Sequence, residues 1–212
     1  MTRLSADAAA ALADAFIRDA LAKAVRVRPS RIVIAASAPH GARGSEYFRR
    51  LARRFGAELF DQGSGSLGRR MARALEPFGS GGALLVGTDT PSLPADLLAR
   101  SIAALRRARV VVAPSLDGGY YAVGVRGAMP PIFSAMRWGR ADVLETTLRR
   151  LNRARIRFAL GPAWYDVDRW SDVMLLAAHL RLMGRARGSR NASPCPATFA
   201  MLRRLGVLGD DR

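Results

Sequence analysis

The pattern of apolar and polar residues changes its period repeatedly along the chain. In Ala6–Ala24 apolar residues recur every three or four positions, the spacing of an amphipathic helix, and Ser5 can cap its first turn. Arg31–Ala36 ("RIVIAA") and Ala83–Val86 are instead short and almost continuously apolar, which is typical of buried strands. The predicted helices are Ala6–Ala24, Ser45–Phe55, Leu67–Phe78, Ala95–Arg107, Arg140–Asn152, Trp170–Met183 and Pro196–Val207, and the predicted strands are Arg31–Ala36, Ala57–Gln62, Ala83–Val86, Val110–Ala113, Gly119–Val125 and Ile156–Leu160.

Helices and strands alternate along most of the chain, and this order predicts the fold class. It favours an α/β domain with a mostly parallel sheet and helices on both faces. We expect this domain to span residues 1–183, followed by a polar linker at 184–194 and a helical tail at 195–212 that packs back on it. The chain opens almost directly into a helix, whereas such domains commonly begin with a strand whose turn offers N–H groups to a phosphate.

The formal net charge of +17 over 212 residues raises the question of nucleic-acid binding. Lys23 is the only lysine, so almost all of the basic charge is arginine, a bias that a GC-rich genome also produces. The arginines are dispersed in pairs over the predicted helices, which favours a solvated surface over a stripe that binds nucleic acid. The excess charge can still steer phosphate-bearing substrates toward the protein.

The cysteine content and the hydropathy of the sequence exclude further classes of protein. Cys195 is the only cysteine, which excludes an internal disulfide and a cysteine metal cluster. Charged residues interrupt the alanine-rich start, and no apolar stretch approaches the roughly 18 residues of a membrane span. We therefore expect a soluble, cytoplasmic protein without a membrane partner.

Two polar clusters follow predicted strands in the first half of the chain. In "DQGSGSLGRRM", Asp61–Met71, glycines allow close backbone approach and Gln62 can face a base edge, although a flexible loop with Ser66 as N-cap explains the same residues. In Thr88-Asp89-Thr90 a carboxylate at a strand end is suited to Mg²⁺ or Mn²⁺, although an ordinary Asx-turn before a helix would use it too.

Two further clusters lie in the second half. "DGGYY", Asp117–Tyr121, places glycines where a side chain would block the backbone, although a simple hairpin turn also uses Asp-Gly. In "YDVDRW" the side chains of Asp166 and Asp168 point the same way in an extended segment and can share a metal, or Asp168 can cap the next helix. Trp138 is more often a packing residue than a ligand platform. No P-loop, G-x-S-x-G or H-E-x-x-H motif occurs in the sequence.

Taken together and in this order, the clusters resemble the GT-A-type glycosyltransferases of the DUF2064 group. This group is related to the molybdopterin-guanylyl and phospholactate-guanylyl transferases, and some members are assigned to arsenosugar biosynthesis. The resemblance spans about Thr2–Leu182. The matching segments are "QGSGSLGRRM" (Gln62–Met71), "GTDTPSLP" (Gly87–Pro94), "PSLDGGYYAVG" (Pro114–Gly124), Trp138 and "DVDRWSDV" (Asp166–Val173).

The resemblance implies a site in which a divalent cation, Mn²⁺ or Mg²⁺, is held on the diphosphate of a nucleotide-sugar. The metal ligands would be Asp89, Asp168 and Asp166, and the catalytic residues Asp89 and Asp117. The nucleotide-binding residues would be Gln62, Gly63, Gly65, Ser66, Leu67, Gly68 and Thr88. The sugar and acceptor side would be formed by Gly118, Gly119, Tyr120 and Trp138.

This sequence departs from the family pattern in three places. Family members begin with a central strand and a "P-x-x-GxVKTRL" loop, whereas here "MTRL" aligns with "KTRL", so that the first strand and its basic loop are missing. We expect this absence, for which a misplaced start is the favoured explanation, to leave two flanking strands unpaired and to remove part of the phosphate site. Ser66 replaces the usual Asp and Leu116 a usual acidic residue, which affects ribose recognition and any acid or base at that position.

The sequence therefore predicts a metal-dependent glycosyltransferase that uses a nucleotide-diphospho-sugar donor and an unknown acceptor. The first alternative is a guanylyltransferase-like nucleotidyltransferase of the same fold, which usually needs a lysine-bearing N-terminal loop. The second is a pseudo-transferase with a binding or scaffold role. An RNA-binding role comes last, and it predicts steeply salt-dependent binding.

Overall fold

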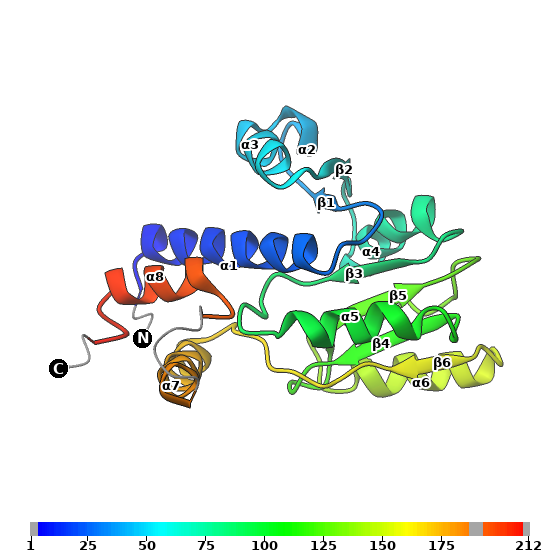
Figure 1. The fold of residues 1–212 in the computed structure, drawn as a ribbon. Helices are drawn as coiled ribbons and strands as arrows, with labels where there is room; N and C mark the ends of the chain where they lie inside the picture. The colour runs from blue at the N-terminus through cyan, green and yellow to red at the C-terminus, as the bar shows by residue number, and fades with distance from the viewer. Residues whose placement is uncertain (1–3, 187–192, 210–212) are drawn as a thin grey trace.

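The computed structural model describes residues 4–186 and 193–209, without the side chains of residues 184–186 (Figure 1). The helices are α1 (Ala6–Arg26), α2 (Gly41–Gly44), α3 (Glu46–Phe55), α4 (Leu67–Leu75), the 3₁₀ turn η1 (Glu76–Phe78), α5 (Ala95–Ala104), α6 (Val143–Arg153), α7 (Trp170–Ala186) and α8 (Pro196–Arg204). The strands are β1 (Val33–Ala36), β2 (Glu58–Asp61), β3 (Ala83–Val86), β4 (Val110–Pro114), β5 (Tyr120–Val125) and β6 (Phe158–Leu160).

The larger sheet has the order β3-β5-β4-β6. β5 runs antiparallel to both of its neighbours, whereas β4 and β6 are parallel, so β3, β4 and β6 all point in one direction. Val110 and Val112 of β4 pack with Met71 and Leu75 of α4 and with Leu151 of α6. The carboxyl ends of three strands therefore meet at one edge of a sheet whose central strands, β4 and β5, are buried.

The opposite face of this sheet is covered by α5. Alternate residues, Ala113 of β4 and Tyr121 of β5, pack there with Leu98, as expected because successive side chains of a strand point to opposite faces. Helices thus cover both faces of the sheet, as predicted from the sequence, and Figure 1 shows α5 on the side toward the viewer.

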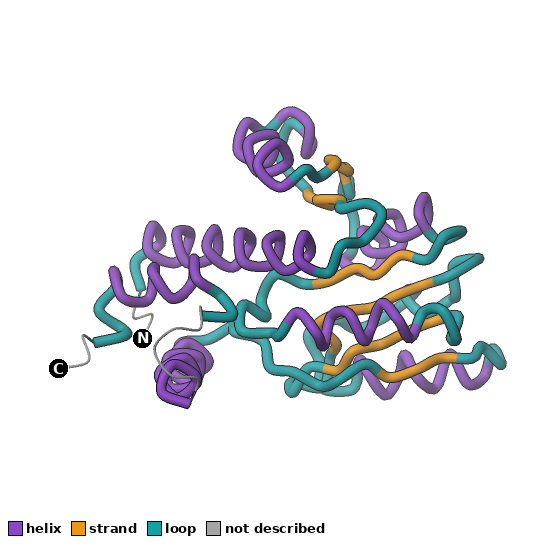
Figure 2. The backbone as a smooth tube through the Cα atoms, viewed as in Figure 1, coloured by secondary structure: helices purple, strands orange, loops and turns teal. Residues whose placement is uncertain are grey.

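The smaller sheet contains only β1 and β2, which pair in parallel from Val33↔Glu58 to Ala36↔Asp61. Figure 2 shows its strands apart from those of the larger sheet. Within the described residues, β1 pairs only with β2 and β3 pairs only with β5, so each has one edge without a strand partner. The sequence analysis expected two flanking strands with open edges, and its explanation, a missing first strand, stays a prediction.

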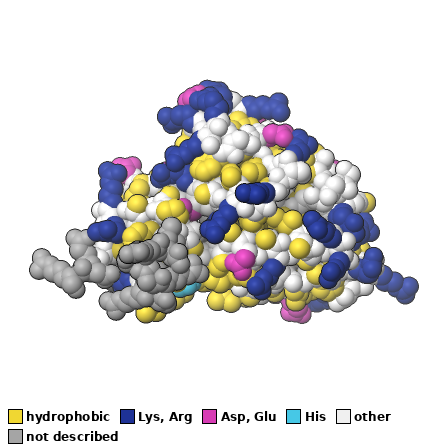
Figure 3. Space-filling model, in the orientation of Figure 1, with side chains coloured by type: hydrophobic (Ala, Val, Ile, Leu, Met, Phe, Trp, Pro, Cys, Tyr) yellow, Lys and Arg dark blue, Asp and Glu magenta, His cyan; other side chains and the backbone are white. Residues whose placement is uncertain are grey.

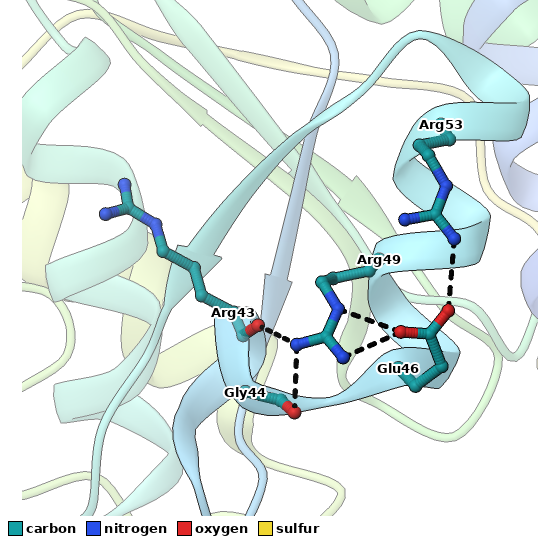
Figure 4. Close-up of polar contacts among 5 residues, drawn as sticks. All are labelled: Arg43, Gly44, Glu46, Arg49 and Arg53. Atoms are coloured by element: carbon teal, nitrogen blue, oxygen red, sulfur yellow. Dashed lines mark hydrogen bonds and ion pairs between the residues drawn. The ribbon is translucent and has the colours of Figure 1, made fainter.

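The smaller sheet is covered by α3, whose two faces differ. Its inner face carries Leu51, which packs with Leu21 of α1 and with Ile34 and Ala36 of β1. On its outer face Glu46 accepts hydrogen bonds from Arg49 and Arg53 (Figure 4). These exposed pairs add little stability, so the unit of residues 31–62 depends mainly on its apolar core, to which α1 contributes.

The C-terminal part of the chain packs on the same long helix. Leu12 and Phe16 of α1 share a core with Leu176 of α7 and Leu202 of α8. The side chain of Asp19, 2% exposed, accepts hydrogen bonds from the N–H groups of Ala197 and Thr198 in the first turn of α8. The helical tail therefore does pack back on the domain.

Most predicted elements are present, with shifted ends. Pro77 tightens the end of the predicted helix Leu67–Phe78 into η1, and the short α2, at Gly41–Gly44, has no predicted counterpart. α7 continues to Ala186, and residues 187–192 of the predicted linker lie outside the described residues. The division into residues 1–183, 184–194 and 195–212 stays a prediction.

Candidate functional site

Three carboxylates gather where the larger sheet ends. Oxygen atoms of Asp117, Asp166 and Asp168 all lie within 4.8 Å of one another. Asp89 lies close enough to Asp166 for the negative charge of Asp166 to raise its pKa. The sequence analysis assigned Asp89, Asp166 and Asp168 to the metal, whereas in the structure Asp117 is the third member of the closest group.

Loops at the ends of two parallel strands bring these residues together. Asp89 follows β3, and Asp117 lies in the tight connection between β4 and β5. The extended segment 164–168 runs between these loops. The N–H of Trp164 donates to the carbonyl oxygen of Pro114 at 3.1 Å, and the N–H of Val167 donates to that of Asp89 at 2.8 Å. Because buried Val167 lies between them, Asp166 and Asp168 share one side of the segment.

For two of the carboxylates the hydrogen bonds test the simpler interpretation of the motif, a helix cap for Asp168 and an Asx-turn for Asp89. The first turn of α7 is capped by Asp172, whose Oδ2 accepts from the N–H groups of Asp168 and Arg169 at 3.1 and 2.8 Å. Asp168 is thus not needed as a cap. Among the described residues Asp89 accepts a side-chain hydrogen bond only from Thr88, at 3.4 Å, and forms no Asx-turn.

Asp117 fits both interpretations of the "DGG" motif. Its Oδ1 accepts hydrogen bonds from the hydroxyl of Ser115 and, at 2.8 Å, from the N–H of Gly119, as in a hairpin turn. A Cβ on Gly118, which has φ of +90°, would lie 2.1 Å from the carbonyl oxygen of Ala141. The turn therefore needs this glycine, and it leaves Oδ2 of Asp117 available to the cluster.

The electrostatics of the cluster suit a cation. Burial raises the pKa of Asp89, and the charge of Asp166 raises it further. The pKa of Asp168 is also raised, first by burial and then by repulsion from Asp166, Asp89 and Asp117. Within residues 4–186 and 193–209 none of these four carboxylates forms an ion pair with a basic side chain. A group of hard oxygen donors without a compensating charge fits Mg²⁺ or Mn²⁺.

The Gly-rich loop that follows β2 is held by local hydrogen bonds. Gly63, with φ of +64°, donates from its N–H to Oδ1 of Asp61 at 2.8 Å, and Gly65 has φ of +114°. Arg73 of α4 donates from its guanidinium to the carbonyl oxygens of Gln62 and Ser64. Hydrogen bonds from α4 thus support the loop, and Arg73 is a contributor that the sequence analysis did not identify.

The start of α4 contains the remaining residues predicted to bind nucleotide. Ser66 caps the helix, since its hydroxyl accepts from the N–H of Arg69 at 3.4 Å, and Leu67 is 42% exposed. A Cβ on Gly68 would lie 2.5 Å from the carbonyl oxygen of Phe133 and 3.0 Å from the ring of Trp138. Gly68 therefore serves close packing in this structure, and its predicted role in nucleotide binding stays a prediction.

Trp138 joins the Gly-rich loop to the acidic side of the site. Besides its contact with Gly68, its ring lies edge-to-face with Tyr120, at 6.2 Å between centroids. The hydroxyl of Tyr120 is buried without a hydrogen-bond partner among the described residues, and burial raises its pKa to about 12. Tyr120 follows Gly119 directly, so packing contacts link the start of α4 to the turn that carries Asp117.

A second polar network, which the sequence analysis did not identify, supports the segment 164–168. The hydroxyl of Ser92 donates to that of Tyr165 at 2.8 Å and accepts from the indole N–H of Trp164 at 3.1 Å. The hydroxyl of Tyr165 also lies 2.7 Å from Nδ1 of His179 in α7. These contacts join the loop after β3, the acidic segment and α7, and only the clustering of Trp, Tyr and Ser near the motifs could have indicated them.

Basic residues do not form a single track on the face shown in Figure 3, where they are scattered between apolar and neutral patches. This agrees with the expectation of a solvated, dispersed charge. Within the part of the chain that the structure describes, no helix is long and apolar enough to cross a membrane.

Comparison with known proteins identifies a family and similar solved structures. Residues 19–140 match the model of the DUF2064 family, described as "Uncharacterized protein conserved in bacteria". A crystal structure of a "putative nucleotide-diphospho-sugar transferase" from Desulfovibrio desulfuricans G20 is 28% identical and superposes with a TM-score of 0.78, over 95% of this chain and 85% of that one. No curated protein matches the chain. The fold is GT-A-like, as the sequence predicted.

Proposed function

Since the chain belongs to the DUF2064 family, we propose that it is a metal-dependent transferase that uses a nucleotide-diphospho-sugar donor. The observation that carries this proposal is the group of Asp117, Asp166 and Asp168 with Asp89 beside it, at the carboxyl ends of β3 and β4. Ligands of open α/β sheets bind at this edge. The similar structure described as a nucleotide-diphospho-sugar transferase supports the same class of reaction.

In this proposal each part of the site has one task. Asp89, Asp166 and Asp168 hold Mn²⁺ or Mg²⁺, which when bound neutralises charge on the leaving diphosphate. Asp117, oriented by Ser115 and Gly119, directs its free oxygen toward the same centre. The loop Gln62–Gly68 and Thr88 bind the base and ribose, while Gly118, Gly119, Tyr120 and Trp138 shape the pocket for sugar and acceptor.

The test is a thermal-shift titration with UDP, GDP, ADP and CDP and their sugars, with and without Mn²⁺. Wild type is compared with Asp89→Asn and Asp166→Asn, and with Asp96→Asn on the exposed surface of α5 as a matched control. We expect one nucleotide to raise the melting temperature only when metal is present, in wild type and in the control. A shift that is independent of metal, or unchanged in both site variants, would contradict the proposal.

Activity and RNA-binding assays on the same variants separate the alternatives. Release of pyrophosphate from a nucleoside triphosphate would show nucleotidyl transfer, and binding without turnover of any donor would show a pseudo-transferase. RNA binding that persists in Asp89→Asn and falls steeply with salt would instead favour the nucleic-acid alternative.

A further inference from the structure

The only lysine of the chain is buried beside the acidic site. Lys23 lies in the last turn of α1 and is 7% exposed. Its Nζ donates hydrogen bonds to the carbonyl oxygens of Thr90 and Pro91, at 3.2 and 2.5 Å. Thr90 and Pro91 immediately follow Asp89, so a buried ammonium from a distant helix is attached to the loop that carries a proposed metal ligand.

The loop needs such a donor because of its own sequence. Pro91 and Pro94 have no N–H, which reduces the backbone donors available to the loop's carbonyl groups. The carbonyl oxygen of Thr90 accepts from the N–H of Leu93 at 3.1 Å, and the ammonium of Lys23 supplies a second donor to it and one to Pro91. Buried carbonyl groups without a partner would destabilise the turn.

The chemistry of the contact explains why a lysine stands here in an otherwise arginine-based chain. An ammonium is a compact charge with three donors that can bond two adjacent carbonyl oxygens, whereas a guanidinium is a wide planar fork. Burial lowers the pKa of Lys23 to about 8, and the nearby Cys195 and Asp19 partly oppose this. Burying a cation costs free energy, which indicates that the hydrogen bonds of Lys23 have a specific structural role.

Lys23 acts on Asp89 through the backbone and not through its charge. The groups that shift the pKa of Asp89 are Thr88 and Asp166, beside burial, and Lys23 is not among them. The backbone of Asp89 is instead held from two directions, by Lys23 at the next two residues and by Val167, whose N–H donates to the carbonyl oxygen of Asp89. These contacts set the position of Asp89 relative to Asp166 and Asp168.

We propose that Lys23 is a positioning residue of the acidic site, whose ammonium holds the turn at Thr90 and Pro91 so that the Asp89 carboxylate joins the metal ligands. This inference rests on the proposed function, because it concerns the same metal site. It adds a residue of α1, outside every motif of the sequence analysis, to the machinery that binds the cation.

The structure offers a matched control on the same helix. Asp19 lies one turn before Lys23 and is also buried, but its carboxylate bonds the start of α8 instead of the loop at Asp89. Asp19→Asn weakens the packing of α1 and leaves the hydrogen bonds of Lys23 in place. Because the charge of Asp19 also raises the pKa of Lys23, the variants are compared at pH 6, well below the pKa of about 8, where the Lys23 ammonium stays protonated. The two residues therefore separate a general loss of stability from a specific effect on metal binding.

The experiment measures Mn²⁺ affinity by electron paramagnetic resonance of free Mn²⁺, at a temperature where all variants are folded. We expect Lys23→Met, which keeps the apolar stem, to bind Mn²⁺ about 10- to 100-fold more weakly, the range found for residues that orient metal ligands. Lys23→Gln, which keeps a donor, should recover part of this loss. Asp19→Asn should bind Mn²⁺ like wild type even if it melts at a lower temperature.

A second measurement makes the inference testable apart from the proposed function. In metal-free protein, amide hydrogen exchange at Leu93 and Val167 should be at least tenfold faster in Lys23→Met than in wild type and unchanged in Asp19→Asn. If wild type binds no Mn²⁺, the proposed function fails, while exchange still reports whether Lys23 holds the turn. Equal Mn²⁺ affinity in wild type and Lys23→Met, or equal exchange at both amides, would overturn the inference.

Discussion

The two sheets of this protein differ in how deeply their strands are buried. In the larger one, Val110, Val111 and Val112 are 0% exposed, and helices cover both faces. In the smaller one, β2 has no fully buried residue, and β1 alternates between partly buried and buried residues. The edge strands of the larger sheet, β3 and β6, are also only partly buried, so the contrast lies between its central strands and the smaller sheet. The acidic cluster lies on the larger sheet, whereas the Gly-rich loop follows the smaller one.

This difference separates two demands on the proposed site. Carboxylates that share a cation must be held within a fraction of an ångström, which requires a rigid support. A loop that closes around a ligand needs freedom to move, and such loops come from regions of low local stability. We infer that the larger sheet fixes the metal side while the unit of residues 31–62 can adjust on the nucleotide side.

The largest effect is expected from truncating one core leucine in each region. Leu151→Ala, at a position 0% exposed beneath the larger sheet, should lower the free energy of unfolding by about 3–4 kcal/mol and speed exchange at all slowly exchanging amides. Leu51→Ala should mainly release the amides of β1, β2 and α3, since Leu51 packs in the core of that unit and not in the core of the larger sheet. Native-state hydrogen exchange checks this, and equal acceleration in β4 and β1 of Leu51→Ala would contradict the separation.

The next effect concerns the contact that joins the two regions. Gly68→Ala places a methyl group 2.5 Å from the carbonyl oxygen of Phe133, a backbone atom that cannot rotate away. We expect a loss of about 2 kcal/mol in urea unfolding and a change in tryptophan fluorescence as Trp138 shifts. Gly81→Ala, where a Cβ would meet nothing within 4 Å, is the matched control and should be nearly neutral. The packing role of Gly68 is wrong if both variants unfold alike.

A smaller and more local effect is expected in the Gly-rich loop. Arg73→Met removes the hydrogen bonds to the carbonyl oxygens of Gln62 and Ser64, which should cost about 1 kcal/mol. Exchange at the amide of Gly63 should become faster while the amides of β4 and β5 stay protected. Arg100→Met, which removes an exposed guanidinium on α5, serves as the control. No change at Gly63 would mean that the loop is held without Arg73.

The smallest expected effect is a gain in stability instead of a loss, because repulsion within the acidic cluster destabilises the folded protein when no cation is bound. A carboxyl group with a raised pKa contributes stability below its ordinary pKa, and this contribution is lost as the pH rises through the raised value in the folded protein. Asp168→Asn should therefore raise the melting temperature of metal-free protein at pH 7 by about 1–2 °C, a modest gain because the side chain is largely exposed.

The pH dependence of this gain provides its check. The difference between Asp168→Asn and wild type should vanish below the ordinary carboxyl pKa, where Asp168 is protonated in both states. Saturating Mn²⁺ should reverse the sign, since only wild type keeps the full set of ligands. A gain that is constant with pH would show that the charge of Asp168 is not its cause.

Periodicity predicted most of the larger sheet because its strands are short apolar runs between long amphipathic helices. The same signal failed at α2, Gly41–Gly44, since four residues with two glycines have neither a period nor a helical preference. The central, antiparallel place of β5 was not predicted either, because its alternating sequence defines a strand but not its neighbours.

In the site, too, residues in local motifs were predicted, whereas residues whose role depends on distant contacts were missed. The sequence motifs predicted each of the four aspartates, because each follows a recognisable turn or strand. The cap formed by Asp172 was missed, since Asp168 lies within one turn and offers the same chemistry. Lys23 was missed because its partners are 67 and 68 residues away, a distance that no spacing rule spans.

The bond between Asp19 and the start of α8 joins residues 178 positions apart and has a consequence for synthesis on the ribosome. α1 is made long before α8, yet its buried carboxylate and the apolar side chain of Phe16 are covered fully only when α8 has been made. At about 5–20 residues per second, α1 waits roughly 10–35 s for its partner. During that interval its apolar face is open to chaperones, and it is covered only after α8 has been synthesised.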